Sequence, residues 1–261
     1  MDVTQEAVLV TGGASGIGLA VARGLLGAGR RVLVADVSQE RLDEVRGMAP
    51  PDRLGCARLD VADEAQVMDT LARLEADFGP ISGLVNSAGI GRDVPFLDTD
   101  AALLRRILEV NLVGSFVVAR EAARRMRERG RGSIVNIASV SGIRGNAGRA
   151  AYGASKGGVV TLTRVMAVEL AAYGIRVNAV AGADRDAAGG ADAYGRGAGG
   201  LAPGGAAASL RGAGRAERHD RLAAGRVAVQ LRDGAGDLRG WRVHCGGDAA
   251  CGALSPLMSM S

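Results

Sequence analysis

Short apolar runs alternate with longer amphipathic segments along most of this chain. The runs lie at residues 7–11, 31–36, 54–59, 83–85, 132–138 and 175–180. Segments 63–78, 103–126 and 150–173 lie between runs and repeat apolar residues at the spacing of a helix face, the second of them with a break or bend near Asn111. Parallel strands need such crossover helices. The sequence therefore predicts an α/β fold: one domain with a doubly wound parallel sheet and helices on both faces.

A glycine-rich turn follows the first apolar run. Residues 12–18 read Gly-Gly-Ala-Ser-Gly-Ile-Gly and lead into a segment with helical spacing. Glycines let the backbone approach a pyrophosphate closely, and the N–H groups that begin the next helix attract its negative charge. The spacing of Gly12, Gly16 and Gly18 differs from the commonest dinucleotide fingerprint, so the turn needs support from its surroundings.

The second apolar run ends in Asp36, 18 residues after Gly18. A carboxylate at this place can accept hydrogen bonds from the ribose of an adenosine. Val37 and Ser38 are not basic, and the glycine turn contains no Arg or Lys, so a 2′-phosphate would face the Asp36 carboxylate uncompensated. The pattern favours NAD over NADP. The alternative is that Asp36 caps the helix that begins near Ser38.

A tyrosine and the sole lysine of the chain, Tyr152 and Lys156, stand four residues apart. This spacing puts both side chains on one helix face. A compact ammonium whose pKa can shift would help a phenol to ionise, and an arginine at the same position could not replace it. The pair is a candidate for proton transfer. The alternative is an ordinary helix residue followed by a solvated lysine.

These motifs belong to a longer ordered set. The chain carries Thr-Gly-x-x-x-Gly-x-Gly at 11–18, Asp36, Asp60-Val61, Asn-x-Ala-Gly at 86–89, Asn111, Ser139 and Tyr-x-x-x-Lys at 152–156. With this set it resembles the short-chain dehydrogenase/reductase family from residue 7 to about residue 180. The resemblance implies a Rossmann-like fold and hydride transfer between C4 of a nicotinamide and a carbonyl or secondary alcohol carbon. It also implies a homo-oligomer, either a dimer or a tetramer.

The resemblance also implies a role for each motif residue. Tyr152 would be the general base in oxidation and the general acid in reduction, and Lys156 would stabilise its phenolate and hydrogen-bond the nicotinamide ribose. Ser139 would orient the substrate oxygen, and Asn111 would hold a helix bend and a proton-relay water. Taken alone, Ser139 could be a turn residue and Asn111 a buried structural amide. The residues implied in NAD binding are Gly12, Ser15, Gly16, Ile17, Gly18, Asp36, Asp60, Val61, Asn86, Ala88, Gly89, Tyr152 and Lys156.

The family pattern ends at Ala181. We therefore expect a nucleotide-binding and catalytic domain at 1–181 and an atypical region at 182–261, which has 18 glycines and 19 alanines but no isoleucine or phenylalanine. If each codon from Ala181 onward is read from its second base, with wobble left free, the encoded residues can be Pro-Gly-Pro-Ile-Glu followed by Thr or Met. This resembles the continuation in the family. We interpret the region as a shifted reading frame, with a divergent but genuine C-terminal region as the alternative.

Composition argues against several other classes. The net charge of +4 comes from dispersed arginines without a basic run, so nucleic acid is not an expected partner. No signal peptide opens the chain and no stretch approaches the ~20 apolar residues of a membrane span, so we expect a soluble cytoplasmic protein. Cys56, Cys245 and Cys251 fit neither a disulfide framework nor a metal knuckle, and we expect no metal, although His244 stands beside Cys245.

The expected activity is oxidation of a secondary alcohol or reduction of a ketone, linked to NAD(H). The loop before the tyrosine is expected to line the mouth of the substrate pocket with Ser141, Ile143, Arg144, Asn146 and Arg149. One alternative is a 3-oxoacyl-thioester reductase, which would normally prefer NADP. Another is a nucleotide-binding protein without turnover, and a third is an interaction role for the glycine-rich region.

Overall fold

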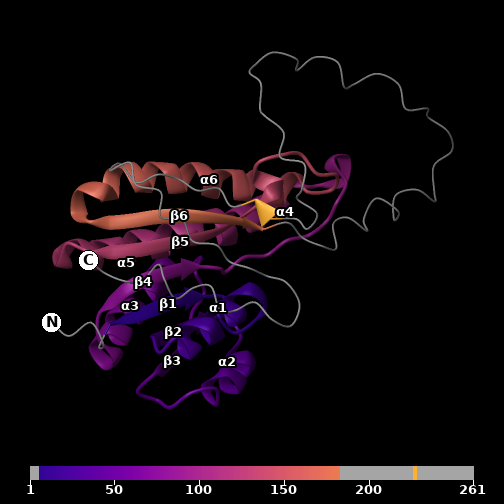
Figure 1. The fold of residues 1–261 in the computed structure, drawn as a ribbon. Helices are drawn as coiled ribbons and strands as arrows, with labels where there is room; N and C mark the ends of the chain where they lie inside the picture. Colours follow the sequence, from indigo (N-terminus) through magenta and orange to yellow (C-terminus); the bar gives the residue numbers. More distant parts are fainter. Residues whose placement is uncertain (1–5, 183–225, 228–261) are drawn as a thin grey trace.

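The structure is a computed structural model that describes residues 6–182 and 226–227 (Figure 1). The strands are β1 (Ala7–Thr11), β2 (Arg31–Asp36), β3 (Leu54–Arg58), β4 (Ile81–Asn86), β5 (Gly132–Ser139), β6 (Ile175–Gly182) and β7 (Arg226–Val227). The α-helices are α1 (Gly16–Gly27), α2 (Gln39–Arg46), α3 (Glu64–Phe78), α4 (Ala101–Leu108), α5 (Gly114–Arg129) and α6 (Ala150–Leu170).

The strands form one sheet in the order β3-β2-β1-β4-β5-β6-β7. The strands from β3 to β6 run parallel, and β7 pairs antiparallel with the end of β6. The order reverses between β1 and β4, and a crevice at the carboxyl ends of strands is expected at such a reversal. Thr11 lies beside Asn86, and Asn86 beside Asn136, so the ends of β1 and β4 meet at this edge. The predicted single-domain, doubly wound parallel sheet is confirmed.

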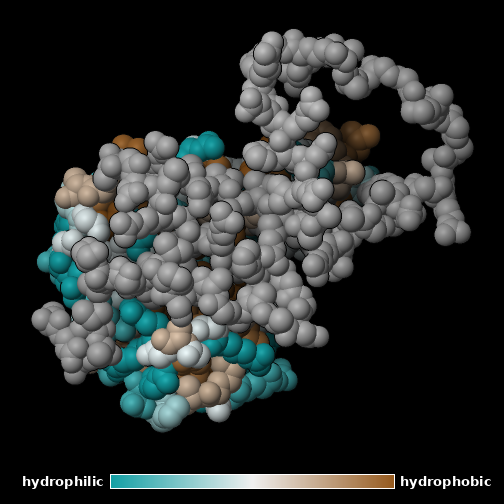
Figure 2. Space-filling model, in the orientation of Figure 1, coloured by the Kyte–Doolittle hydropathy of each residue, from teal (hydrophilic) through white to brown (hydrophobic). Residues whose placement is uncertain are grey.

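Helices cover both faces of the sheet, which explains why β1 is buried along its whole length. On one face, α1 and α2 pack in a cluster that contains Val8, Val10, Val21, Leu25, Val32, Val34 and Leu42. On the other, α3, α5 and α6 pack in a cluster that contains Leu9, Leu33, Leu71, Leu84, Val118, Ile134 and Ala167. Hydrophilic residues prevail in the lower part of Figure 2, where α2 turns its charged side to solvent.

Side-chain caps fix where three of the helices begin. Each cap oxygen accepts a hydrogen bond from a backbone N–H of the first turn, which would otherwise have no partner. The pairs are Ser38 with Arg41, Asp63 with Gln66, and Asp100 with Leu103. The cap of α2 is thus Ser38 and not Asp36.

The predicted helix at 103–126 is interrupted where the sequence indicated a bend. Helix α4 ends at Leu108, a π-helical turn spans Glu109–Val113, and α5 begins at Gly114. A π turn inserts one residue into the helical repeat and is frequent at functional sites. Asn111 lies within this turn, so the expected irregularity is present.

Other predicted boundaries shift by a few residues. The helix expected over 150–173 ends at Leu170, followed by a 3₁₀ turn at Ala171–Tyr173 and by Gly174 in the left-handed region.

Some predictions fall outside the described residues. They are the atypical region at 182–261, apart from Gly182 and β7, its shifted reading frame, and the residues His244, Cys245 and Cys251. Among the described helices, none has the length and apolar character needed to cross a membrane.

Gly174 offers a test of this fold. Its φ is +68°, and a Cβ placed on it would lie 2.1 Å from the carbonyl oxygen of Gly130. We expect Gly174→Ala to lower the free energy of unfolding by about 3 kcal/mol or more, because backbone strain and overlap with a rigid main chain add. Gly29→Ala is the matched control: its φ is +81° with open space around it, and it should cost about 1 kcal/mol. Equal losses in urea unfolding would contradict the packing argument.

Candidate active site

The predicted tyrosine and lysine lie in the first two turns of α6. The Nζ atom of Lys156 is 5.8 Å from the centroid of the Tyr152 ring, and it donates a 2.7 Å hydrogen bond to the carbonyl of Ile137 in β5. The lysine is only 5% exposed, which excludes the alternative of a solvated side chain. The Nζ also lies close to the segment after β4, because a Cβ added to Gly89 would be 3.6 Å from it. The carboxyl edge of the sheet therefore brings the pair close to the ends of β4 and β5.

Burial changes the acidity of the lysine. Desolvation disfavours the ammonium and lowers the pKa of Lys156 from 10.5 to about 8. No carboxylate among the described residues forms a salt bridge with it to offset this effect. The side chain is consequently cationic at neutral pH but loses its proton within the mildly alkaline range.

Asn111 joins three segments through its side-chain amide. Its Oδ1 accepts from the N–H of Ile90 at 2.7 Å, and its Nδ2 donates to the carbonyl of Ile90 at 2.8 Å and to the hydroxyl of Ser155 at 3.0 Å. The side chain is fully buried. Its Oδ1 and both hydrogens of its Nδ2 are thus engaged within the protein. The amide ties the loop after β4 and helix α6 to the π turn, and the predicted proton-relay role of Asn111 stays a prediction.

Ser155 is a residue of the site that the sequence analysis missed. Its hydroxyl accepts from Asn111 and donates to the carbonyl of Tyr152 at 2.7 Å. Ser155 is fully buried, and the neighbouring Lys156 is buried as well. The sequence does carry a signal for Ser155, because it stands between Tyr152 and Lys156 in the Tyr-x-x-Ser-Lys motif, one residue before the lysine. Ser155 couples the π turn to the turn of α6 that carries the tyrosine.

Ser139 ends β5 beside the start of α6. Its Oγ accepts a 3.2 Å hydrogen bond from the N–H of Ser141 and caps the short 3₁₀ turn Val140–Gly142, so the turn role considered as an alternative is present. Within the described part of the chain its hydroxyl hydrogen meets no acceptor, so the hydroxyl can donate to another oxygen. Asn146 donates to the Ser141 hydroxyl at 2.8 Å and orders the loop that follows.

The glycine turn is tightly folded on one side and open on the other. A Cβ on Gly18 would lie 2.2 Å from the carbonyl oxygen of Gly12, and one on Gly12 would lie 2.8 Å from the Cα of Ala88. Gly16 has a φ of +52° and open space where a Cβ would point. The side chain of Ser15 makes no hydrogen bond that caps α1. The helix therefore presents an accessible N-terminus of the kind that receives a pyrophosphate.

The carboxylate of Asp36 is oriented by two backbone donors. Its Oδ2 accepts from the N–H of Ala14 at 3.2 Å, and its Oδ1 accepts from the N–H of Ser38 at 3.1 Å. The side chain thus lies between the glycine turn and the start of α2, and it is 7% exposed. This placement suits a carboxylate that receives ribose hydroxyls, because each oxygen keeps lone pairs for further donors.

Three other predicted cofactor residues have structural contacts. Asp60 accepts from the N–H of Ala62 at 3.0 Å, and Val61 packs closely against Gly114. Asn86 is 3% exposed and donates to the carbonyl of Ser115 and to the side chain of Asn136. Their predicted contacts with a cofactor stay predictions, as does the role of Ile17, which is exposed.

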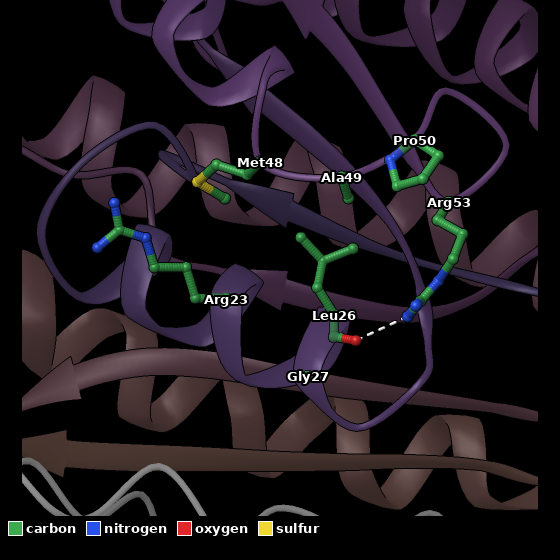
Figure 3. A pocket seen from close by; sticks show the side chains of 7 residues that line it. All are labelled: Arg23, Leu26, Gly27, Met48, Ala49, Pro50 and Arg53. Carbon is green, nitrogen blue, oxygen red and sulfur yellow. Dashed lines mark hydrogen bonds between the residues drawn. The ribbon is translucent and has the colours of Figure 1, made fainter.

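A separate hollow of about 500 Å³ lies at the opposite edge of the sheet (Figure 3). It is lined by Arg23, Leu26, Gly27, Met48, Ala49, Pro50 and Arg53. These residues end α1 or precede β3, so they belong to the amino edge and not to the edge where the tyrosine and lysine lie. The guanidinium of Arg53 is bound to the carbonyl oxygens of Leu26 and Arg30.

Comparison with known proteins agrees with this arrangement. A family model described as short chain dehydrogenase matches residues 6–188. Levodione reductase of Leifsonia aquatica is 42% identical over 183 residues, 68% of each chain. The 3-oxoacyl-acyl-carrier-protein reductase of Bos taurus is 41% identical over 172 residues, 66% of this chain and 72% of that one. The structure of an NAD⁺-bound xylitol dehydrogenase is 35% identical with a TM-score of 0.65, covering 69% of this chain and 70% of the other.

Fold and relatives together define an oxidoreductase of the α/β class. The chain belongs to the short-chain dehydrogenase/reductase family. The predicted family is thereby confirmed, and its members named above are all dehydrogenases or reductases.

The lowered pKa of Lys156 has a consequence for stability. Between about pH 8 and 10.5 the unfolded chain holds a lysine proton that the folded chain has lost, so this residue makes stability rise with pH. We expect the free energy of unfolding of the cofactor-free protein to gain about 1.4 kcal/mol per pH unit from Lys156 in this window, an increment missing in Lys156→Met. Urea unfolding of both proteins from about pH 7 to 9.5 measures it. Parallel pH profiles would refute the lowered pKa.

Proposed function

We propose that the protein is an NAD(H)-dependent oxidoreductase that interconverts a secondary alcohol and a ketone, with Tyr152 as the general acid and base. The observation that carries the proposal is the buried Lys156 ammonium 5.8 Å from the Tyr152 ring, at the carboxyl edge of a doubly wound sheet. The ordered glycine turn and Asp36 at the same edge support a dinucleotide as the hydride carrier.

The proton chemistry rests on the phenol of Tyr152. A free tyrosine has a pKa of about 10 and is a poor base at neutral pH. Two features favour its phenolate: the ammonium of Lys156, and the positive end of α6, because Tyr152 lies in the first turn of this 21-residue helix. In oxidation Tyr152 takes the hydroxyl proton of the alcohol, and in reduction it returns a proton to the carbonyl oxygen.

Two further residues would position the substrate. The available hydroxyl hydrogen of Ser139 would bind the substrate oxygen and stabilise the charge that develops on it. Asn111 would hold the π turn and, through Ser155, the backbone of Tyr152. The contacts described for each side chain support these roles.

NAD would lie across the carboxyl edge. The open side of Gly16 and the N-terminus of α1 would receive the pyrophosphate, and Asp36 would accept the ribose hydroxyls. When bound, the nicotinamide supplies or accepts the hydride. The NAD⁺-bound xylitol dehydrogenase, a relative with 35% identity, supports a nicotinamide cofactor.

Replacing Tyr152 tests the proposed proton transfer. We expect Tyr152→Phe to reduce kcat/KM at least ~10³-fold with any active substrate, because the hydroxyl that moves the proton is missing. NADH affinity, measured by fluorescence titration, should change less than about threefold. Tyr173→Phe is the control, since Tyr173 is exposed in the turn after α6. Retained turnover in Tyr152→Phe would exclude the proposed base, and NADH binding without turnover in the wild type would favour the nucleotide-binding alternative.

Replacing Asp36 tests the proposed choice of NAD over NADP. We expect Asp36→Asn to lower the ratio of NAD to NADP affinity about tenfold, because the amide keeps one acceptor but removes the charge that repels a 2′-phosphate. Calorimetry with both nucleotides measures this ratio. Asp43→Asn, on the exposed side of α2, removes the same charge without a contact to the glycine turn. An unchanged ratio in Asp36→Asn would show that this carboxylate does not select NAD.

A 3-oxoacyl-thioester reductase is the second candidate. It is supported by the relative from Bos taurus at 41% identity. The Asp36 carboxylate argues against it, because such enzymes normally prefer NADP and this carboxylate would repel the 2′-phosphate of NADP. A screen that compares 3-oxoacyl thioesters with simple and cyclic ketones, each with NADH and NADPH, separates the two candidates.

We also propose that the protein is a homo-oligomer, either a dimer or a tetramer. Apolar side chains that are exposed in the single chain lie on the outer side of α5 and α6, among them Phe116, Val165 and Val168. Val168 is 73% exposed, which favours burial against a second copy. Light scattering of the purified protein measures the assembly. A cytoplasmic location remains a prediction from the sequence.

A further inference from the structure

An arginine lies against the ring of the proposed base. Arg149 precedes the first residue of α6, and its Cζ is 5.2 Å from the centroid of the Tyr152 ring. Its Nε forms a 2.6 Å salt bridge with Oδ1 of Asp93, on the loop after β4. The Arg149 side chain is 16% exposed, whereas that of Asp93 is 61% exposed. The Arg149 side chain is thus mostly buried, whereas its partner is exposed to solvent.

The same loop is fastened to the start of α6 by its backbone. The N–H of Val94 donates to the carbonyl of Gly148 at 2.9 Å, and Val94 forms a parallel bridge with Arg149. A Cβ on Gly91 would lie 3.2 Å from Cδ2 of Tyr152 and 3.8 Å from a terminal nitrogen of Arg149. Loop, guanidinium and phenol ring therefore form one packed unit.

Two cations consequently lie close to the Tyr152 ring. The Nζ of Lys156 is 5.8 Å from the ring centroid, and the Cζ of Arg149 is 5.2 Å from it. The other charged residues of the packed loops are Asp93, which is paired with Arg149, and the exposed Arg92 and Arg144. A guanidinium keeps its charge at every pH at which the protein is folded, whereas the Lys156 ammonium is half deprotonated near pH 8. Arg149 is the cation that persists beside the phenol at alkaline pH.

We propose that Arg149 is a positioning residue that stabilises the phenolate of Tyr152, and that Asp93 holds it there and attenuates its charge. This inference rests on the proposed function, because it assigns Arg149 to the acid and base of that reaction. It predicts the direction in which each substitution shifts the apparent pKa of Tyr152. Loss of the Arg149 charge should raise the apparent pKa of Tyr152, and loss of the Asp93 charge should lower it.

The test is a direct titration of the tyrosine, which needs no turnover. The chain has three tyrosines, so ¹³C-labelled tyrosine gives few NMR resonances, and Tyr152→Phe assigns the one of interest. We expect Arg149→Gln to raise the apparent pKa of Tyr152 by about 0.5–1 unit and Asp93→Asn to lower it by about half as much. Arg144→Gln, which removes an exposed arginine of the neighbouring loop, should leave it within about 0.2 unit, and Arg149→Lys should restore most of the wild-type value.

The outcomes separate this inference from the proposed function. An unchanged pKa in Arg149→Gln, or shifts of the same sign in Arg149→Gln and Asp93→Asn, would overturn the inference, because loss of packing acts alike in both variants. Opposite shifts support it even if no alcohol or ketone is turned over, in which case the proposed function alone fails. Where turnover is measurable, the pH midpoint of kcat/KM for alcohol oxidation should move with the NMR value in each variant.

Discussion

The amide of Asn111 is the contact on which the candidate site depends. It binds both polar groups of the Ile90 backbone and the hydroxyl of Ser155, and the π turn brings it to these partners. Ser155 passes this constraint to the backbone of Tyr152. A buried amide with all of its bonds made holds its neighbours in one arrangement, because each lost bond leaves an unsatisfied polar group that costs about 1–3 kcal/mol. This amide thereby fixes α6 relative to the loop after β4.

A second buried network adjoins the first. Asn86 in β4 donates to Asn136 in β5, and Asn136 donates to Thr163 in α6 at 2.9 Å. Ser115 links the two networks, because its hydroxyl donates to the carbonyl of Asn111 and its own carbonyl accepts from Asn86. The Oδ1 of Asn86 is buried without a hydrogen-bond partner among the described residues. These hydrogen bonds between polar side chains thus align α5 and α6 with β4 and β5, next to the candidate site at the carboxyl edge of the sheet.

The sequence predicted what local pattern encodes and missed what only tertiary contact creates. Strand positions, the glycine turn and the irregularity at Asn111 follow from periodicity and residue type over a few neighbours. The partners of Asn111 are 21 and 44 residues away, and Asp93 is 56 residues from Arg149. No spacing rule connects such residues, so the contact of Ser155 with Asn111 and the salt bridge between Asp93 and Arg149 emerge only when the loop after β4 is folded onto α6. The pKa of Lys156 was likewise inaccessible, because desolvation depends on the whole burial shell.

The burial of Lys156 has a practical consequence for chemical labelling. The chain has one lysine, so its only primary amines are this ε-amino group and the α-amino group of the chain. Lys156 is 5% exposed and its ε-amino group is hydrogen-bonded to the carbonyl of Ile137, while the lowered pKa leaves a larger fraction of this group unprotonated and nucleophilic at mildly alkaline pH. Reductive methylation of the folded protein would therefore report on access to a single buried nitrogen. Protection of that nitrogen from the reagent would serve as a measure of site occupancy for any ligand, including ligands that undergo no reaction.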